Sequence, residues 1–206
     1  TVEQLGTHTD TLVVMTETSK AILSKDYAVD ATKIQVIPHG IHPEPFSDGK
    51  KAKTKLGLQG KLIVSTFGLL SKGKGIEYGI EALPDVIKEF PNLEYHILGA
   101  THPAVLAEEG ETYRESLARK VEKLGLQSHV IFHNKYLALK ELLCFLEATD
   151  IYMALTTDPD QAVSGTFSYA LGAGRPVIST PFSQALEVIN SENGILAEFK
   201  KPAAFR

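Results

Sequence analysis

The sequence QAVSGTFSYALGAGRPVIST at residues 161–180 has the pattern of a small-residue turn, a helix, a glycine turn and a buried strand. It follows a strand-like run from Asp150 to Leu155, so the local order is strand, turn, helix, strand. A helix that begins at Ser164-Gly165-Thr166 leaves backbone N–H groups unpaired, and small side chains there let an anion approach them. The pattern predicts a phosphate site, although Ser, Gly and Thr also cap many helices that bind nothing.

A second glycine-bearing turn lies between a strand expected at Lys61–Phe67 and a helix expected at Ile76–Phe90. It contains Gly68, Lys72 and Lys74. Glycine permits close approach of a ligand, and lysine supplies a compact positive charge for phosphate. In isolation this signal is weak, because both lysines also fit a solvated loop.

Strand and helix signals alternate along the chain after a linker at Pro43–Lys55 that reads as loop. Short, β-branched or wholly apolar segments are typical of buried parallel strands. They fall at Lys61–Phe67, Leu93–Leu98, Val130–His133, Ile151–Leu155, Val177–Thr180 and Gly194–Ala197. Helical spacing of apolar residues occurs at Ile76–Phe90 and Tyr113–Leu124. This order predicts an α/β fold with a Rossmann-like, doubly wound parallel sheet, whose ligands bind at the carboxyl ends of the strands.

Composition excludes several classes of protein. The 206 residues carry a formal net charge of -4 with both signs interspersed, which argues against nucleic acid as a partner. The longest apolar runs are too short for a transmembrane segment. Cys144 is the single cysteine and lies in an apolar run, so we expect a core thiol and a reducing compartment, the cytoplasm.

Metal and dinucleotide sites are weaker interpretations. Asp158-Pro159-Asp160 supplies two carboxylates, which is only part of a metal site and fits a turn better. The histidines show no helical i, i+4 pair, so we expect no zinc site. The glycine turn after Phe67 lacks the Gly-x-Gly-x-x-Gly order of dinucleotide-binding domains.

The two glycine turns together resemble glycosyltransferase family four, the group one glycosyl transferases, which are retaining nucleotide-sugar enzymes of GT-B architecture. The family turn reads Gly-Arg-Leu, three variable residues and Lys-Gly, and here it corresponds to Gly68-Leu69-Leu70 and Lys74-Gly75. The resemblance implies that Lys74 binds the diphosphate. Leu69 stands at the Arg position, so phosphate neutralisation is incomplete unless Lys72 takes that role.

The segment Ala173-Gly174-Arg175-Pro176 resembles the entry to a later strand of the family, and Glu187-Val188-Ile189 resembles its Glu-hydrophobic-hydrophobic segment. Counted from there, the glutamate pair of the family falls on Gln161 and Tyr169. Gln161 carries no charge but is expected to orient sugar hydroxyls, and Tyr169 occupies the ribose-binding position. This segment resembles the pattern of a divergent bacterial subgroup, which has Gln, two further residues, Ser-Gly-Thr and then Tyr-Ala.

Upstream, strands expected at Asp10–Thr16 and Ile34–Gly40 enclose a helical stretch. They resemble the end of the family's N-terminal acceptor domain and its linker. We therefore expect residues 1–48 to be a remnant of that domain, and residues 49–206 to be a C-terminal nucleotide-sugar-binding domain truncated before its final helix. His39 is either a cleft residue or a polar loop residue.

The resemblance implies transfer of a sugar from a nucleoside diphosphate sugar to a carbohydrate or lipid-linked acceptor, which the missing N-terminal domain would bind. Lys74 and Gln161 are the expected catalytic residues. The expected nucleotide-sugar-binding residues are Gly68, Lys72, Ser164, Gly165, Thr166, Tyr169, Asn134 and Tyr136, of which the last two equally fit a loop cap. No metal or other cofactor is expected, and residues 1–206 alone are expected to be inactive. The alternatives are a non-catalytic nucleotide-sugar-binding module and a sugar-nucleotide hydrolase or epimerase.

Overall fold

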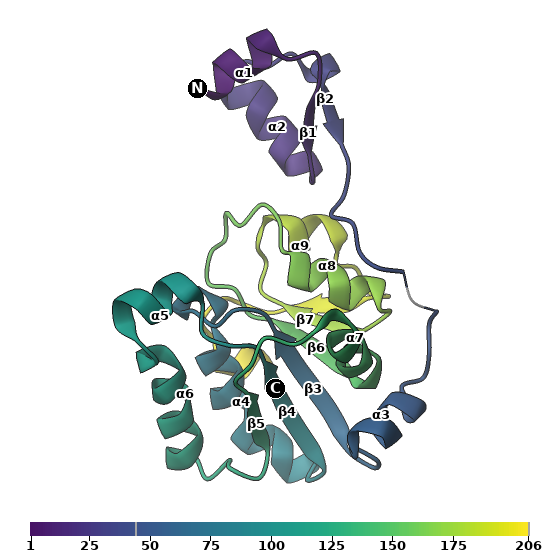
Figure 1. The fold of residues 1–206 in the computed structure, drawn as a ribbon, viewed down its shortest axis with the longest axis vertical. Helices are drawn as coiled ribbons and strands as arrows, with labels where there is room; N and C mark the ends of the chain where they lie inside the picture. The colour runs from purple at the N-terminus through teal and green to yellow at the C-terminus, as the bar shows by residue number, and fades with distance from the viewer. Residues whose placement is uncertain (44, 206) are drawn as a thin grey trace.

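The computed structural model describes residues 1–43 and 45–205, which form two units joined by a linker (Figure 1). The N-terminal unit pairs two short parallel strands and covers them with helices. Its elements are α1 (Val2–His8), β1 (Leu12–Val14), α2 (Glu17–Asp26), the 3₁₀ turn η1 (Ala31–Lys33) and β2 (Ile34–Val36). The strand-helix-strand order expected here is confirmed.

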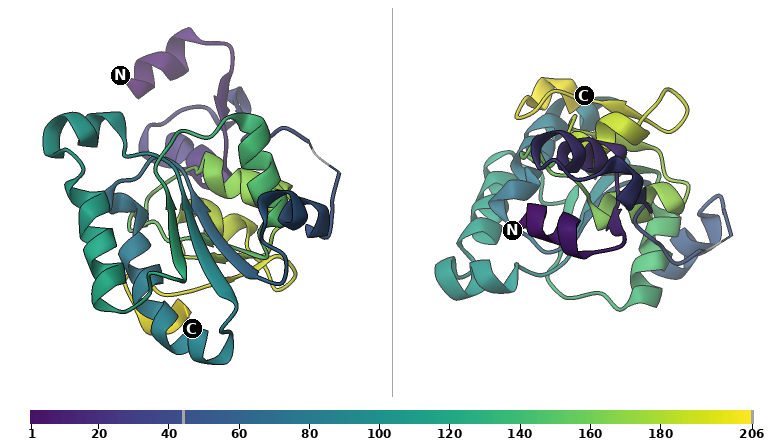
Figure 2. Two further views of the ribbon diagram at one scale, coloured as in Figure 1. Left: turned by 60° about the horizontal axis from the view of Figure 1, so that its bottom comes forward. Right: turned by 90° about the horizontal axis from the view of Figure 1, so that it is seen from above.

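The larger unit is a six-stranded, wholly parallel sheet in the order β5-β4-β3-β6-β7-β8. The strands are β3 (Leu62–Phe67), β4 (Leu93–Leu98), β5 (Val130–His133), β6 (Ile151–Ala154), β7 (Val177–Ser179) and β8 (Gly194–Leu196). The helices are α3 (Lys50–Leu56), α4 (Ile76–Glu89), α5 (Pro103–Glu109), α6 (Thr112–Lys123), α7 (Leu139–Ala148), α8 (Gly165–Gly172) and α9 (Ser183–Val188), with 3₁₀ turns η2 (Lys72–Lys74) and η3 (Pro202–Phe205). Helices flank the sheet on both sides (Figure 2).

The predicted doubly wound parallel sheet is therefore confirmed, and each of the six strands expected in this unit agrees with an observed one to within one residue at either end. Apolar side chains on both faces explain this agreement. Ile80 and Leu117 are buried in the cluster of α4 and α6 on one face, whereas Ile63 and Phe145 belong to another cluster that includes α7. Strands covered on both sides have the near-continuous apolar sequence that made them recognisable.

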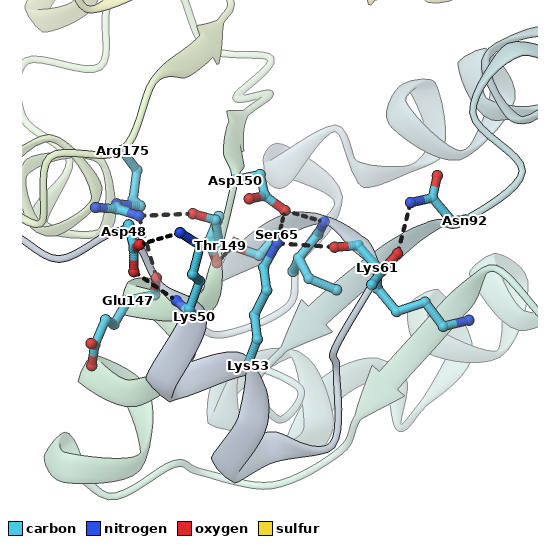
Figure 3. A network of polar contacts seen from close by, with 12 residues as sticks. Asp48, Lys50, Lys53, Lys61, Ser65, Asn92, Glu147, Thr149, Asp150 and Arg175 are labelled. Atoms are coloured by element: carbon cyan, nitrogen blue, oxygen red, sulfur yellow. Dashed lines mark hydrogen bonds and ion pairs between the residues drawn. The ribbon is translucent and has the colours of Figure 1, made fainter.

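The prediction of a loop over Pro43–Lys55 is wrong at its end, because α3 begins at Lys50. Its lysines gave no apolar periodicity, and only Ala52 is buried. Tertiary contacts hold the helix: the Lys53 ammonium contacts Asp150 Oδ2 at 2.5 Å and donates to the carbonyl of Lys61 at 2.9 Å (Figure 3). Packing against the rest of the fold outweighs a weak local signal.

The sheet order reverses between β3 and β6. From β3 the chain adds β4 and β5 on one side, and β6 then returns to the other side of β3, where β7 and β8 follow. The connections that leave the carboxyl ends of two such strands run in opposite directions, so a crevice remains between them. This crevice is the usual ligand site of open α/β sheets. Both glycine turns follow these two strands.

The buried side chain of Arg175 connects the linker to the larger unit through hydrogen bonds. Arg175 is 7% exposed, and its guanidinium donates to the carbonyl oxygens of Thr149 and Glu147 at 3.2 and 3.3 Å (Figure 3). It also donates to the carbonyl oxygens of Ser47 and Ala173 at 3.0 and 2.9 Å. These carbonyls belong to the linker, to the end of α7 and to the turn before β7. One side chain thus joins three segments.

The N-terminal unit also contacts α9, on the side of the larger unit where α8 and α9 lie (Figure 1). The Glu187 carboxylate accepts hydrogen bonds from the backbone N–H groups of Glu17 and Thr18 at 3.0 and 2.6 Å. It therefore caps the first turn of α2 from another part of the chain, and these hydrogen bonds hold its pKa below the ordinary value of a glutamate. In the described residues no helix is both long and apolar enough to cross a membrane.

Replacing the buried guanidinium tests the role of this arginine. Arg175→Met keeps the volume but leaves the carbonyls of Ser47 and Thr149 without their donor, so we expect a loss of about 3 kcal/mol in the free energy of unfolding. Urea denaturation measures the loss. The control is Lys50→Ala, because the Lys50–Asp48 pair is exposed and should contribute little to stability. Equal effects of the two variants would contradict the assignment.

Candidate phosphate-binding site

The glycine turn after β3 packs directly against the end of β6. Gly75 has φ +62, and a Cβ there would lie 2.1 Å from the carbonyl oxygen of Leu155. The amide of Thr157 also donates to the carbonyl of Gly73 at 3.0 Å. Only glycine permits this approach, and the turn therefore carries Lys74 into the crevice between the two strands.

The second turn leads into α8, which begins where the sequence predicted. Ser164 is the N-cap, and its Oγ accepts from the amide of Phe167 at 3.3 Å. The backbone N–H of Ser164 donates to Oε1 of the buried Gln184 at 2.7 Å. Gln184 thus fixes the N-cap from α9.

Two backbone N–H groups at the start of α8 have no acceptor among the residues that the structure describes. Within the described residues, no hydrogen bond is made by the amides of Gly165 or Thr166. Such groups at a helix N-terminus are satisfied by water or by an anion, and the helix dipole favours negative charge there. This end of α8 is therefore suited to an anionic ligand.

The two turns converge at this point. A Cβ built on Gly68 would lie 3.1 Å from Thr166 Cγ2 and 3.8 Å from Lys74 Nζ. A small recess at the same place is lined by Lys74, Gln161, Ser164 and Thr166, with side chains of β3 and β6 behind them. These contacts show that both turns meet at one place, at the carboxyl ends of neighbouring parallel strands.

Lys74 is the charged group of this recess. Its ammonium makes no ion pair or hydrogen bond within the described part of the chain, and burial lowers its pKa below the ordinary value of a lysine. A half-buried cation without a counter-ion is costly, because desolvation is not offset by attraction. The arrangement favours an anionic ligand as the missing partner.

Gln161 and Tyr169 make contacts that the sequence did not indicate. Gln161 Oε1 accepts from Thr156 Oγ1 at 2.8 Å, and its Nε2 donates to the carbonyl of Val163 at 3.1 Å. The Tyr169 hydroxyl shares a hydrogen bond of 2.5 Å with Nδ1 of His42 in the linker. Both side chains are therefore held in place by neighbouring residues.

Three of the expected binding residues lie apart from this cluster. Lys72 Nζ pairs with Glu109 at 2.8 Å on an exposed surface. Asn134 and Tyr136 follow β5, two strands away from β3, and both are exposed. Nothing in these contacts tests their roles toward a ligand, which stay predictions.

Sequence reasoning missed Gln184, Thr156 and His42. Each acts on an expected site residue, and none lies in a motif of its own. Gln184 is 20 positions from Ser164, and His42 is 127 positions from Tyr169. No local pattern could have paired Gln184 with Ser164 or His42 with Tyr169, because the fold alone brings these residues together.

Two further expectations concern Cys144 and metal ligands. Cys144 is only half-buried, so its placement in the core was wrong, and it lines a groove of about 940 Å³ between the linker, α3 and α7. We assign the phosphate site to the smaller recess because the free amides and Lys74 lie there. Asp158 Oδ1 accepts from the amide of Asp160 at 3.0 Å, as in a turn, and no group of three or more potential metal ligands occurs in residues 1–43 and 45–205.

Comparison with known proteins gives the family. The model of the family "Glycosyl transferases group 1" matches residues 61–206, and the chain belongs to this family. Spore coat protein SA of Bacillus subtilis (strain 168) is 27% identical over 172 residues, 80% of this chain and 44% of that protein. D-inositol 3-phosphate glycosyltransferase of Segniliparus rotundus is 28% identical over 130 residues, 62% of this chain and 28% of that protein. The chain spans less than half the length of these curated relatives.

Solved structures confirm the predicted fold class, a doubly wound parallel sheet of the GT-B type. The structure of Anabaena Alr3699/HepE in complex with UDP matches with a TM-score of 0.80 and 21% identity, over 98% of this chain and 54% of that one. The C-terminal domain of the glycosyl transferase LpcC from Francisella tularensis matches with a TM-score of 0.64 and 24% identity, over 77% of this chain and 78% of that one.

Because Lys74 has no ion-pair partner in the described part of the chain, its charge is expected to lower the stability of the ligand-free protein. Lys74→Met keeps the aliphatic stem and removes the buried charge, so we expect the free energy of unfolding at pH 7 to rise by about 1 kcal/mol. Because the pKa of Lys74 is lower in the folded chain, the loss of stability caused by its charge has its full size at pH values below the folded-state pKa. It disappears as the pH rises through the unfolded value near 10.5.

Urea denaturation at pH 7 and near pH 10.5 measures the difference between Lys74→Met and the unchanged chain, which should shrink at the higher pH. Lys72→Met serves as the matched control, because Lys72 is exposed and paired with Glu109. It should change stability by less than about 0.5 kcal/mol. A loss of stability in Lys74→Met would show that the ammonium has a partner in the free chain.

Proposed function

We propose that this chain binds the diphosphate of a nucleoside diphosphate sugar and supports retaining transfer of the sugar to an acceptor. The observation that carries the proposal is the half-buried Lys74 beside the amides of Gly165 and Thr166, all three without a partner in residues 1–43 and 45–205. Membership of the group one glycosyl transferases and the fold shared with a UDP-bound protein support it. On this proposal the chain belongs to the divergent bacterial subgroup, an assignment that the pattern from Gln161 to Tyr169 supports.

The chemical demand is stabilisation of a leaving group. When the bond between sugar and phosphate breaks, negative charge accumulates on the departing phosphate. Donors aimed at that charge lower the barrier more than they stabilise the bound donor. Lys74 Nζ and the two amides of α8 have this role, and they need no divalent metal or other cofactor.

Gln161 and Tyr169 act on the sugar and the ribose. Gln161 retains one N–H that no contact in the described chain uses, and it is oriented by Thr156. That N–H donates to a hydroxyl of the transferred sugar. Tyr169, where the family has a carboxylate, presents its hydroxyl toward the ribose together with His42. Asn134 and Tyr136 contact the base, and a carbohydrate or lipid-linked acceptor binds through the N-terminal domain.

A non-catalytic nucleotide-sugar-binding module is the second candidate. Leu69 replaces the arginine of the family turn, and Lys72 is engaged with Glu109 rather than with the recess. The site then has one cation for two phosphates, which is enough for binding but weaker in transition-state stabilisation. Donor-dependent product from an enzyme assay excludes this candidate.

Substitution of Lys74 tests the diphosphate site. Lys74→Ala should weaken UDP binding by about 1.5–3 kcal/mol, the range for a charge-assisted hydrogen bond. Uridine, which lacks phosphates, should bind with unchanged affinity. Isothermal titration calorimetry measures both. Lys72→Ala is the matched control. An equal loss of UDP affinity would show that Lys72 replaces the missing arginine, and a negligible loss would show that Lys72 is a solvated charge. Unchanged UDP binding by Lys74→Ala would remove Lys74 from the site.

Removal of metal tests the role of fixed protein charges. If Lys74 and the α8 amides replace a cation, UDP should bind with the same affinity, within about twofold, in EDTA and in magnesium. Thermal shift with UDP, GDP, ADP, CDP and TDP under both conditions measures this and also identifies the base. A ligand at a hundred times its dissociation constant stabilises by about 2.7 kcal/mol, which is easily detected. Strict dependence on magnesium or manganese would instead favour Asp158 and Asp160 as ligands.

A further inference from the structure

The linker between the two units contacts the first residue of α8 through His39. A Cβ built on Gly165 would lie 2.9 Å from His39 Nε2 and 3.3 Å from Cε1. The imidazole edge therefore rests against the backbone of the residue that begins the helix. Tyr169, one turn along α8, approaches the same ring edge-on, with 6.4 Å between ring centroids.

The two ring nitrogens of His39 have different surroundings. Nδ1 is buried and has no hydrogen-bond partner within the described residues, whereas Nε2 lies on the edge that faces Gly165. A neutral imidazole carries one proton, and the hydrogen bonds of the ring decide which nitrogen holds it. A buried N–H without an acceptor is rarer in proteins than an under-satisfied acceptor. The proton is therefore assigned to Nε2, and Nδ1 is left as a bare acceptor.

In this tautomer the Nε2–H of His39 is a third hydrogen-bond donor near the backbone amides of Gly165 and Thr166. The amides of Gly165 and Thr166 have no acceptor in the described chain, and His39 Nε2–H lies against Gly165. We propose that His39 donates a hydrogen bond from Nε2 to the phosphate group bound at the N-terminus of α8. The proposal rests on the diphosphate site proposed above and adds a ligand contact from outside the nucleotide-binding unit.

A purely structural role for His39 is the competing explanation. Gly165 leaves room for the ring, Gly172 is similarly close to Ile41, and a Cβ there would lie 2.1 Å from Ile41 Cδ1. The linker thus packs along α8 through both residues. Packing alone, however, needs only the shape of the ring, whereas donation to phosphate needs a polar hydrogen at the position of Nε2.

Amide side chains separate the two explanations. The amide nitrogen of Gln can take the place of Nε2, whereas the shorter side chain of Asn reaches only the position of Nδ1. We measure the affinities of UDP, uridine and inorganic pyrophosphate for the 206-residue chain and for its His39→Ala, His39→Gln and His39→Asn variants by isothermal titration calorimetry. Ile41→Ala is the matched control, because it loosens the same linker at the other end of α8.

We expect His39→Ala and His39→Asn to weaken UDP and pyrophosphate about tenfold or more, with uridine unchanged. His39→Gln should recover most of the loss, and Ile41→Ala should stay within about twofold of the unchanged chain. UDP affinity unaltered in His39→Ala, or recovered equally by Asn and Gln, would overturn the proposal while the diphosphate site stands. Absence of UDP and pyrophosphate binding in the unchanged chain would instead contradict the proposed function itself.

Discussion

The parallel pairing of β3 with β6 is the constraint on which the site depends. Val64 pairs with Ile151 and Ser65 with Tyr152, and Thr66 Oγ1 continues the contact by donating to the carbonyl of Met153 at 2.8 Å. This pairing aligns two strands that are more than 80 positions apart, and the connections that follow them diverge. Because carboxyl ends of parallel strands meet at one edge, the turn of Gly68 and the N-terminus of α8 must meet as well.

Close approach of the backbone brings the two turns into tight contact. Gly68 and Gly75 occur at positions where a Cβ would crowd Thr166 or the carbonyl of Leu155. The same geometry leaves the Lys74 ammonium in a recess with no counter-ion in the described chain. On the proposed function, the feature that is expected to lower the stability of the free chain also prepares it to bind phosphate, since the charge and the amides are in place beforehand.

The sequence predicted the sheet because its strands are buried on both faces and therefore read as continuous apolar runs. It also predicted the start of α8 at Ser164-Gly165-Thr166 from capping chemistry. It failed for α3, whose lysine-rich sequence has little apolar periodicity and whose stability comes from distant partners such as Asp150. It also placed Cys144 too deep, because an apolar run on a short helix such as α7 has an outer face as well as an inner one. The partners that orient the site, Gln184 and His42, are long-range contacts with no local signal.

The central claim is that the free amides of α8 and the first glycine turn bind the phosphates of a nucleotide. The most direct measurement is a ¹H–¹⁵N correlation spectrum of the chain during titration with UDP. The account predicts that the amide signals of Gly165, Thr166 and Gly68 shift most, because new hydrogen bonds form at these N–H groups or beside them. Shifts confined to other parts of the chain, with these three signals unmoved at saturation, would contradict it.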